Sequence, residues 1–247
     1  RGHVGVFAMR GSRVLSHRGQ ERFAYCSSFK WVLGAAILGQ VDQGKLTLDR
    51  EIPFSEKDLM EYSPVTRPQV GRGRMSVRDL CAATIGLSDN TAADLLLPLA
   101  GGLQGLTAFV RSHGDAVMRF DRPEPHLNSN LPGDPRDTTT PEAMARLLKT
   151  MLETEVLKVE SRNQLLAWMK GATTGPERIR KSVPQGWALA HKTGTSGNGA
   201  VHDVAVIFPP KGDPIYVCIF TNASHTDLAR SEAAIAQAAH DVIETLR

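Results

Sequence analysis

The sequence predicts an α+β fold: an antiparallel sheet built from both chain ends and flanked by helices, with an inserted all-α domain. Two observations predict it. Runs rich in β-branched and aromatic residues lie near both chain ends, whereas residues 45–170 contain apolar patterns of helical period and no convincing strand. A length of 247 residues allows one large domain or two small ones. We therefore expect a discontinuous α/β domain, residues 1–24 and 178–247, and an all-α domain, residues 25–177.

The first elements are predicted to be a β-hairpin and a buried helix. Residues 4–9 and 13–17 are short β-prone runs around a turn at residues 10–12. Residues 28–41 are apolar on nearly every side, which is typical of a helix at the centre of a core. Gly44 is expected to stop that helix, because glycine is frequent just past a helix C-terminus.

The middle of the chain carries a series of helical patterns. Several follow a capping residue, such as Thr140, which precedes a proline and a glutamate suited to the first helical turn. The predicted helices span residues 76–84, 91–99, 103–112, 141–152 and 161–169. Residues 120–140 are rich in proline, asparagine and aspartate and have no period. A loop of this length in a compact domain is usually functional.

Strands are expected again near the C-terminal end. The β-prone runs at residues 187–192, 201–208 and 215–221 are separated by turn formers. Residues 231–246 form an amphipathic pattern and are expected to be a closing helix. These strands and the N-terminal hairpin would together make one sheet.

Composition and charge exclude several classes of function. The formal net charge of +3 falls far short of a nucleic-acid-binding arm, and no apolar run approaches the ~20 residues of a membrane-spanning helix. Three cysteines exclude a disulfide framework, and the eight histidines lack zinc-ligand spacing, so we expect neither a metal nor a cofactor. Residues 39–45 nearly match a phosphate-binding loop, but Leu46 replaces the required hydroxyl residue and the segment follows a helix, not a strand.

Four short motifs occur in order along the chain. They are S-x-x-K at residues 27–30, S-D-N at 88–90, E-x-x-L-N at 124–128 and K-T-G at 192–194. One S-x-x-K is expected by chance in a chain of ordinary composition, but all four in this order are a coincidence on the order of 10⁻⁴. The motifs therefore point to one common site.

The S-x-x-K motif has the chemistry of an activated nucleophile. Ser27 stands at the start of the predicted buried helix, where the helix dipole and a free backbone N–H suit an oxyanion. Lys30 lies three residues further on, faces the same side and can take up the serine proton. The alternative is a simple helix cap and a surface lysine, which leaves a lysine in an apolar helix unexplained.

The other motifs also have ordinary structural explanations. S-D-N precedes a helix, which its aspartate or asparagine could cap without any catalytic role. Lys192 could be a plain edge-strand lysine, or a positive charge facing a cleft beside a glycine that permits close approach. Glu124 could be a solvated loop acid, or a general base if its loop is held in place. Arg122 and Asp137 flank that loop and could close it, provided that the pair is partly buried.

Together, the four motifs resemble those of the class A serine β-lactamases. The resemblance covers nearly the whole chain, and residues 61–66, 134–139 and 203–207 also resemble family segments. It implies the serine β-lactamase and penicillin-binding-protein-like fold. It also implies hydrolysis of the β-lactam ring of penicillins and cephalosporins, which gives antibiotic resistance. The alternatives are a penicillin-binding DD-peptidase, against which the E-x-x-L-N motif argues, and a non-catalytic β-lactam sensor that would stay acylated.

The resemblance implies a role for each motif residue. Ser27 would be the nucleophile that opens the ring, with its own backbone N–H and that of Thr195 as the oxyanion hole. Lys30 would activate Ser27, alone or with Glu124 acting through water, and Ser88 would relay a proton to the ring nitrogen. Glu124 would also deprotonate the water that releases the acyl group. The implied substrate-binding residues are Asn90, Asn128, Lys192, Thr193, Thr195, Arg178 and Tyr62.

The sequence also departs from the family pattern. It begins on a strand, where the family usually has a helix first, and its cysteines lack their usual partners. Ser196 and Gly34 stand where relatives carry the cysteines that would pair with Cys26 and Cys81. Cys81 and Cys218 lie on apolar faces and are expected to be buried thiols.

Substrate range, location and partners follow only from the resemblance. Arg178 with Thr195 resembles carbapenem-active members, whereas Ser196 resembles extended-spectrum variants, so the substrate range stays open. The family implies a periplasmic or secreted monomer, whose signal peptide is not in this sequence. Its expected partners are β-lactam antibiotics and β-lactam-type inhibitors, and neither nucleic acid nor a membrane.

Overall fold

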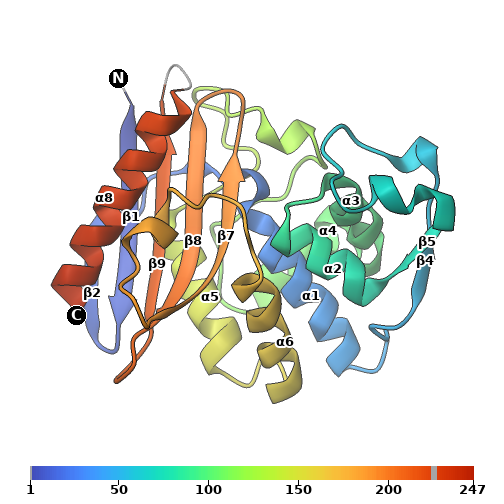
Figure 1. Cartoon of the computed structure of the whole chain (residues 1–247), viewed down its shortest axis with the longest axis horizontal. Coiled ribbons are helices and arrows are strands. Elements are labelled where there is room, and N and C mark those ends of the chain that lie inside the picture. The colour runs from blue at the N-terminus through green and yellow to red at the C-terminus, as the bar shows by residue number, and fades with distance from the viewer. Residues whose placement is uncertain (1, 224–226) are drawn as a thin grey trace.

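A computed structural model describes residues 2–223 and 227–247. In these residues a five-stranded antiparallel sheet forms the main layer, in the strand order β2-β1-β9-β8-β7 (Figure 1). Its strands are β1 (His3–Arg10), β2 (Arg13–His17), β7 (Ala188–Thr195), β8 (Ala200–Phe208) and β9 (Ile215–Asn222). Two strands come from the start of the chain and three from its end, so the predicted α+β fold is confirmed.

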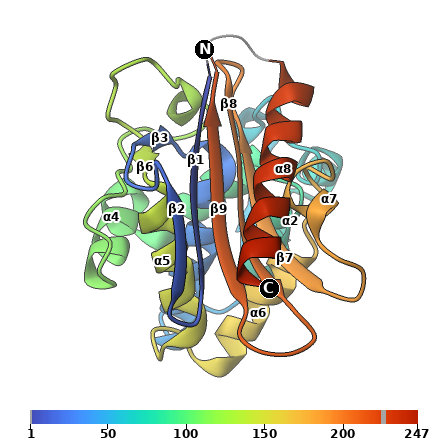
Figure 2. The same ribbon diagram turned by 90° about the vertical axis from the view of Figure 1, so that its left-hand side faces the viewer.

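Helices cover both faces of this sheet because side chains alternate along each strand. In β1, Val6 and Ala8 belong to one apolar cluster, which includes residues of α8, while Phe7 and Met9 belong to another on the opposite face. Figure 2 shows α8 on one side of the sheet and α5 on the other. The helices beside the sheet are α5 (Pro141–Glu153), α6 (Val159–Lys170), α7 (Ile179–Ser182) and α8 (Leu228–Leu246).

Helix α1 (Lys30–Asp42) is the centre of the helical part of the molecule. Its residues from Lys30 to Gly39 are all buried, as the unbroken apolar pattern predicts. The helices packed around it are α2 (Val77–Gly86), α3 (Asn90–Leu96), α4 (Gly102–Ser112) and α6. Short 3₁₀-helices are η1 (Cys26–Phe29), η2 (Glu56–Asp58), η3 (Arg67–Arg72), η4 (Leu97–Ala100) and η5 (His126–Asn128). The S-x-x-K motif therefore lies across the junction of η1 and α1.

In the described part of the chain no single helix is long and apolar enough to cross a membrane. Asn90–Ala100 and Gly102–Ser112 pass that test together, by length and composition alone, with a bend of 71° between them.

The prediction that residues 45–170 contain no strand is wrong. β4 (Glu51–Pro53) pairs with β5 (Arg74–Ser76), and β6 (Thr138–Thr139) pairs with β3 (Phe23–Ala24). Runs of two or three residues are too short to show the period of two on which a strand prediction depends. The predicted domain boundaries, after residues 24 and 177, stay a prediction.

The short β3–β6 pair places the long loop next to the S-x-x-K motif. β3 leads directly into η1, and β6 follows the loop at its C-terminal end. Tyr25 N donates a hydrogen bond to Asp137 O over 3.1 Å, so the backbone pairing continues almost to the motif. The C-terminal end of the loop, at Asp137, is therefore bonded to Tyr25, which precedes Ser27 by two residues.

Candidate active site

The S-x-x-K serine lies in η1, just before α1. Ser27 is half-buried, and its Oγ donates a hydrogen bond to Glu124 Oε1 over 3.3 Å. Ser28 holds η1 in place, because its N and Oγ both donate to Tyr25 O. Gly194 of β7 lies so close that a Cβ there would be 2.7 Å from Tyr25 O. The small size of Gly194 thus permits the approach of β7 to η1. The substrate access expected from the sequence stays a prediction.

Lys30 is fully buried, so the alternative of a surface lysine is wrong. Its Nζ lies 3.1 Å from Glu124 Oε1 and donates to Ser88 O over 2.9 Å. It also donates to Asn90 Oδ1, so the three N–H groups of the ammonium have three acceptor residues. Burial lowers the pKa of Lys30, and the neighbouring Glu124 carboxylate opposes that shift.

The S-D-N motif supplies both a helix cap and contacts to Lys30. Asp89 is buried, and its carboxylate accepts from three backbone N–H groups, one of them in the first turn of α3. The capping alternative is therefore confirmed for Asp89. Ser88 and Asn90 contact Lys30 instead. Tyr62 O accepts from Asn90 N over 3.0 Å, which places the half-exposed Tyr62 beside the motif.

Lys192 of K-T-G is also fully buried, although β7 is an edge strand of the sheet. Its Nζ donates to Ser88 Oγ over 3.0 Å and to Thr193 O over 2.7 Å. Burial lowers the pKa of Lys192 well below its ordinary value, and the nearby charge of Lys30 lowers it further. Ser88 Oγ lies between two ammonium groups, 3.4 Å from Lys30 Nζ and 3.0 Å from Lys192 Nζ.

Arg178, Thr193 and Thr195 come together along β7. Arg178 is 4% exposed, and its Nη2 donates to Thr195 Oγ1 over 2.8 Å. Its Nε lies 3.1 Å from Glu232 Oε1, which balances the buried guanidinium. Thr193 Oγ1 lies 2.6 Å from Thr174 Oγ1. The sequence did not indicate Thr174, because it lies in a stretch without helical or strand periodicity.

Glu124 is 5% exposed, so the alternative of a solvated loop acid is wrong. η5 brings Asn128 Nδ2 to 2.6 Å from Glu124 Oε2, while Ser27 and Lys30 share Oε1. Asn128 Oδ1 is buried and has no hydrogen-bond partner within the described residues. A buried polar atom of this kind is suited to an external donor such as a water molecule.

The fold and the motif residues match a known family. A sequence model of the β-lactamase enzyme family matches residues 1–246. The structure of an ancestral class A β-lactamase is similar to this chain, with a TM-score of 0.96 and 48% identity over 99% of this chain and 94% of that one. This chain belongs to the class A β-lactamases.

Individual β-lactamases from three organisms show the same relationship. The carbapenem-hydrolysing β-lactamase KPC of Klebsiella oxytoca is 44% identical over 99% of this chain and 84% of its own length. β-Lactamase L2 of Stenotrophomonas maltophilia is 46% identical over 88% of this chain and 72% of its own length. A β-lactamase structure from Desulfarculus baarsii has a TM-score of 0.94 and 45% identity, covering 99% of this chain and 92% of that one.

In this β-lactamase a buried carboxylate closes the loop that carries Glu124. Asp137 is fully buried, and its carboxylate accepts from the backbone N–H groups of Asp121 and Arg122. The Arg122 guanidinium pairs with the same carboxylate, and Tyr25 OH lies 3.2 Å from it. The predicted pairing of Arg122 with Asp137 is confirmed, and the pair is partly buried, as an effective clamp requires.

We expect Arg122→Ala to lower the free energy of unfolding by about 3 kcal/mol, because it leaves a buried carboxylate without its counter-charge. Denaturant unfolding followed by circular dichroism measures the change. Arg136→Ala is the matched control, since Arg136 pairs with Asp134 on the same loop but is half exposed. It should cost less than about 1 kcal/mol. Equal losses in the two variants would contradict a buried clamp.

A second set of contacts ties this loop to the turn between β7 and β8. Ser196 Oγ donates to Asn128 O over 2.6 Å, and Asn198 Nδ2 donates to Ser129 O over 2.7 Å. Asn130 Nδ2 donates to Asn198 O over 2.7 Å. The bonded residues are 68 or 69 positions apart in the chain, so no local pattern in the sequence could reveal them.

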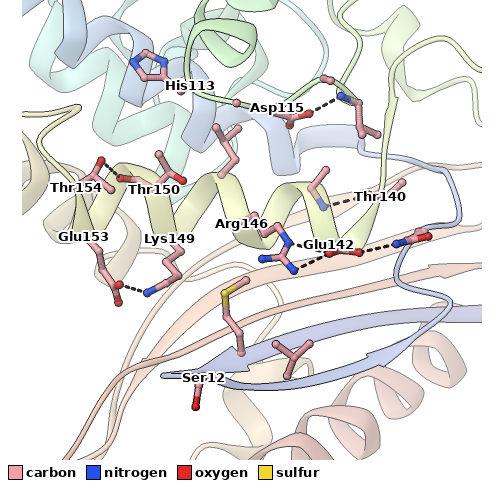
Figure 3. Close-up of a pocket in the computed structure, with 18 of the residues that line it drawn as sticks. Ser12, His113, Asp115, Thr140, Glu142, Arg146, Lys149, Thr150, Glu153 and Thr154 are labelled. Atoms are coloured by element: carbon pink, nitrogen blue, oxygen red, sulfur yellow. Dashed lines mark hydrogen bonds and ion pairs between the residues drawn. The ribbon is translucent and has the colours of Figure 1, made fainter.

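Neither the cysteines nor a large cavity belongs to the predicted site. The three cysteines are free and buried, as expected for Cys81 and Cys218. A cavity of about 1000 Å³ lies between α5 and the β1–β2 hairpin (Figure 3), and its lining, which includes Ser12, Glu142 and Lys149, contains no predicted site residue. In residues 2–223 and 227–247 no group of three His, Cys, Asp or Glu side chains could hold a metal ion.

His202 of β8 is a buried histidine in contact with the site. Its ring packs against Phe23 and Phe220, and its backbone O accepts from Arg178 Nη1 over 2.9 Å. Burial lowers the pKa of His202 to about 3, so the side chain is neutral in the folded protein near pH 7.

We expect His202 to reduce stability in acid. The unfolded chain takes up this proton near pH 6.5 and the folded chain only near pH 3, so the free energy of unfolding falls as the pH decreases between these values. At pH 5 the contribution is a loss of about 2 kcal/mol. Unfolding curves at pH 7 and 5 should show that the free energy of unfolding falls less between these two values in His202→Gln than in the parent. The exposed His240→Gln control should leave the loss unchanged, and an equal loss in both variants would contradict the assignment.

Proposed function

We propose that this chain hydrolyses the β-lactam ring of penicillins and cephalosporins through a covalent acyl-enzyme on Ser27, and so confers antibiotic resistance. One observation carries the proposal: Glu124 Oε1 lies 3.3 Å from Ser27 Oγ and 3.1 Å from Lys30 Nζ. A serine beside a buried carboxylate and a buried lysine has the surroundings of an activated nucleophile. Membership of the class A family supports the substrate class.

In the acylation step, Ser27 Oγ attacks the β-lactam carbonyl carbon, so that an O–C bond forms and the ring C–N bond breaks. The Ser27 proton passes to the Glu124–Lys30 pair, whose carboxylate lies in direct reach of the hydroxyl. Ser88 gives its proton to the ring nitrogen and takes one in return from Lys30 Nζ, which lies 3.4 Å from Ser88 Oγ, so that the proton gained from Ser27 ends on the ring nitrogen. The backbone N–H groups of Ser27 and Thr195 hold the oxyanion.

In the deacylation step, Glu124 acts as general base for a water molecule. Asn128 Nδ2 fixes one oxygen of Glu124, and the buried Asn128 Oδ1 can accept a hydrogen bond from that water. The water oxygen adds to the acyl carbon, the bond to Ser27 breaks, and Ser27 regains a proton. This arrangement argues against a DD-peptidase and against a sensor, because neither needs rapid release of the β-lactam acyl group.

The proposed substrate site combines buried cations and hydroxyl groups along β7. The residues proposed to bind the substrate carboxylate are Arg178, Lys192, Thr193 and Thr195. Two cations beside one strand attract a single anionic group strongly, because burial reduces screening by solvent. Asn90 would hold the acyl side-chain amide, and Tyr62, which is half exposed, would stack on the ligand at the mouth of the site.

We also propose a secreted or periplasmic monomer that needs no metal. The family resemblance supports both the location and the oligomeric state. Sedimentation velocity should therefore give a single species of about 26.8 kDa. A carbapenem belongs in the substrate panel, because a relative with 44% identity is named as carbapenem-hydrolysing.

Turnover of a chromogenic cephalosporin tests the proposed function. We expect many turnovers per protein molecule, because Glu124 and Asn128 are placed to release the acyl group. A burst of one product per protein followed by no further reaction would instead favour a sensor or a peptidase. Added EDTA should leave the rate unchanged, and loss of activity would indicate a metal requirement.

A further inference from the structure

Three polar side chains that the proposed mechanism does not use form a chain of hydrogen bonds beside β7. Adjacent residues of a strand point to opposite faces, so His191 lies on the face opposite to Lys192. His191 and Asp203 are fully buried, and His191 Nδ1 lies 2.9 Å from Asp203 Oδ1. Arg180 Nη2 lies 3.1 Å from His191 Nε2. Burial of such groups is costly, so a chain of them within the fold needs an explanation.

One protonation state of His191 satisfies both neighbours. Nδ1 faces a carboxylate and must donate, whereas Nε2 faces a guanidinium and must accept. A neutral imidazole with its proton on Nδ1 meets both requirements. Arg180 therefore donates to His191, and His191 donates to Asp203, so each side chain orients the next.

The two ends of this chain of hydrogen bonds hold residues 172–180, an irregular segment that runs into the first residues of α7. Arg180 Nη2 also donates to Ala172 O over 2.8 Å, at the start of the segment. Asp203 Oδ2 accepts from Ile179 N over 3.2 Å, near its end. Ile179 is thus tied directly to β8, and Ala172 is tied to β7 through Arg180 and His191.

The groups next to the proposed carboxylate site lie between these two points. Thr174 Oγ1 is 2.6 Å from Thr193 Oγ1, and Arg178 Nη2 donates to Thr195 Oγ1 over 2.8 Å. A shift of residues 172–180 would displace both contacts. Glu124 is held separately, by the loop that Asp137 closes, so the same shift would leave it in place.

We propose that Arg180, His191 and Asp203 are positioning residues for the substrate carboxylate, because they hold residues 172–180 against β7. The inference rests on the proposed β-lactam hydrolysis. Loss of these positioning residues should affect acylation and deacylation differently. Acylation requires the substrate carboxylate to be seated, whereas deacylation begins with a substrate that is already covalently held and uses Glu124.

Arg180→Ala tests this inference. The value of kcat/KM for a penicillin, which reports acylation, should fall about 10- to 100-fold, because a displacement of about 1 Å can cost that much. The decay rate of the preformed acyl-enzyme, followed by intact mass, should be unchanged. Arg180→Lys keeps a single donor and should recover part of the loss. Lys181→Ala is the matched control, since Lys181 lies on the same helix, is 60% exposed and pairs with Glu177.

Two results would overturn the inference: an unchanged kcat/KM in Arg180→Ala, or equal losses in acylation and deacylation. The second would indicate general loosening of the protein. If Arg180→Ala does not fold, Asp203→Asn, which keeps the size of the side chain, is judged by the same comparison of the two rates. A parent protein that forms no acyl-enzyme would overturn the proposed function itself, which is a different and distinguishable result.

Discussion

Ser27→Gly is expected to abolish the covalent attachment of β-lactams and to reduce turnover roughly 10⁴- to 10⁶-fold. The serine hydroxyl is half-buried beside β7 and already bonded to the buried Glu124 carboxylate, so its loss removes the proposed attacking atom. Glycine also leaves the neighbouring Lys30–Glu124 contact without steric change. Intact mass of samples quenched with acid during turnover of a saturating penicillin should show an acyl adduct in the parent and only the free protein in the variant.

The adjacent serine provides the matched control for this experiment. Ser28 Oγ donates to Tyr25 O over 2.6 Å inside η1, so Ser28 stabilises the turn and lies outside the proposed chemistry. Ser28→Ala should therefore still form the adduct, although a lost buried hydrogen bond will lower its stability by about 1 kcal/mol. A surviving adduct in Ser27→Gly would refute the assignment of Ser27 as nucleophile.

Elements with a long, regular pattern could be predicted from the sequence. Helix α1 is buried along residues 30–39, which matches its unbroken apolar pattern, and the strands at both chain ends alternate between two apolar clusters. The pairs β3–β6 and β4–β5 could not be predicted in this way, because they contain only two or three residues per strand. Tertiary contacts, rather than local periodicity, determine where such short pairs form.

The candidate site shows the same division between local and distant information. The motifs indicated Ser27, Lys30 and Glu124, because their spacing and chemistry are visible in the chain itself. The contacts of Thr174 with Thr193 and of Asn198 with Ser129 were missed. These are single hydrogen bonds between segments whose meeting depends on the whole fold, and no residue pattern marks them.

Burial of the proposed site cations would allow a protein with a net charge of only +3 to attract an anionic substrate. Lys30, Lys192 and Arg178 are buried, and the carboxylates that lie against Lys30 and Arg178 are Glu124 and Glu232. When the three cations and the two carboxylates are all charged, the five groups together carry a net charge of +1. Burial and the charge of Lys30 lower the pKa of Lys192, so a bound substrate carboxylate would favour its protonated form. The attraction is thus concentrated at the proposed site and does not need a basic surface.

Glu124→Ala is expected to stop turnover after acylation and to leave a long-lived acyl-enzyme, with kcat reduced about 10³-fold. Removal of the carboxylate takes away the proposed base for the deacylating water, together with the contact that fixes Asn128 Nδ2. It also removes the charge that raises the pKa of Lys30, so the desolvation of Lys30 acts unopposed by Glu124 and favours its neutral form. A neutral Lys30 can accept the Ser27 proton, which is why acylation should survive. Intact mass followed over hours after mixing with a penicillin measures the lifetime of the adduct.

Asn128→Ala separates the role of Glu124 as a base from its contact with Asn128 Nδ2. It keeps the contacts of Glu124 Oε1 with Ser27 and Lys30 and removes only the side-chain amide, including the buried Oδ1 proposed to accept a hydrogen bond from the water. Deacylation should therefore slow by about 10-fold, which is less than in Glu124→Ala. The water would be less well placed, but Glu124 would still be present to deprotonate it. Turnover by Glu124→Ala at the parent rate would remove Glu124 from the mechanism. Failure of Glu124→Ala to acylate would instead make Glu124, and not Lys30, the group that the first proton transfer requires.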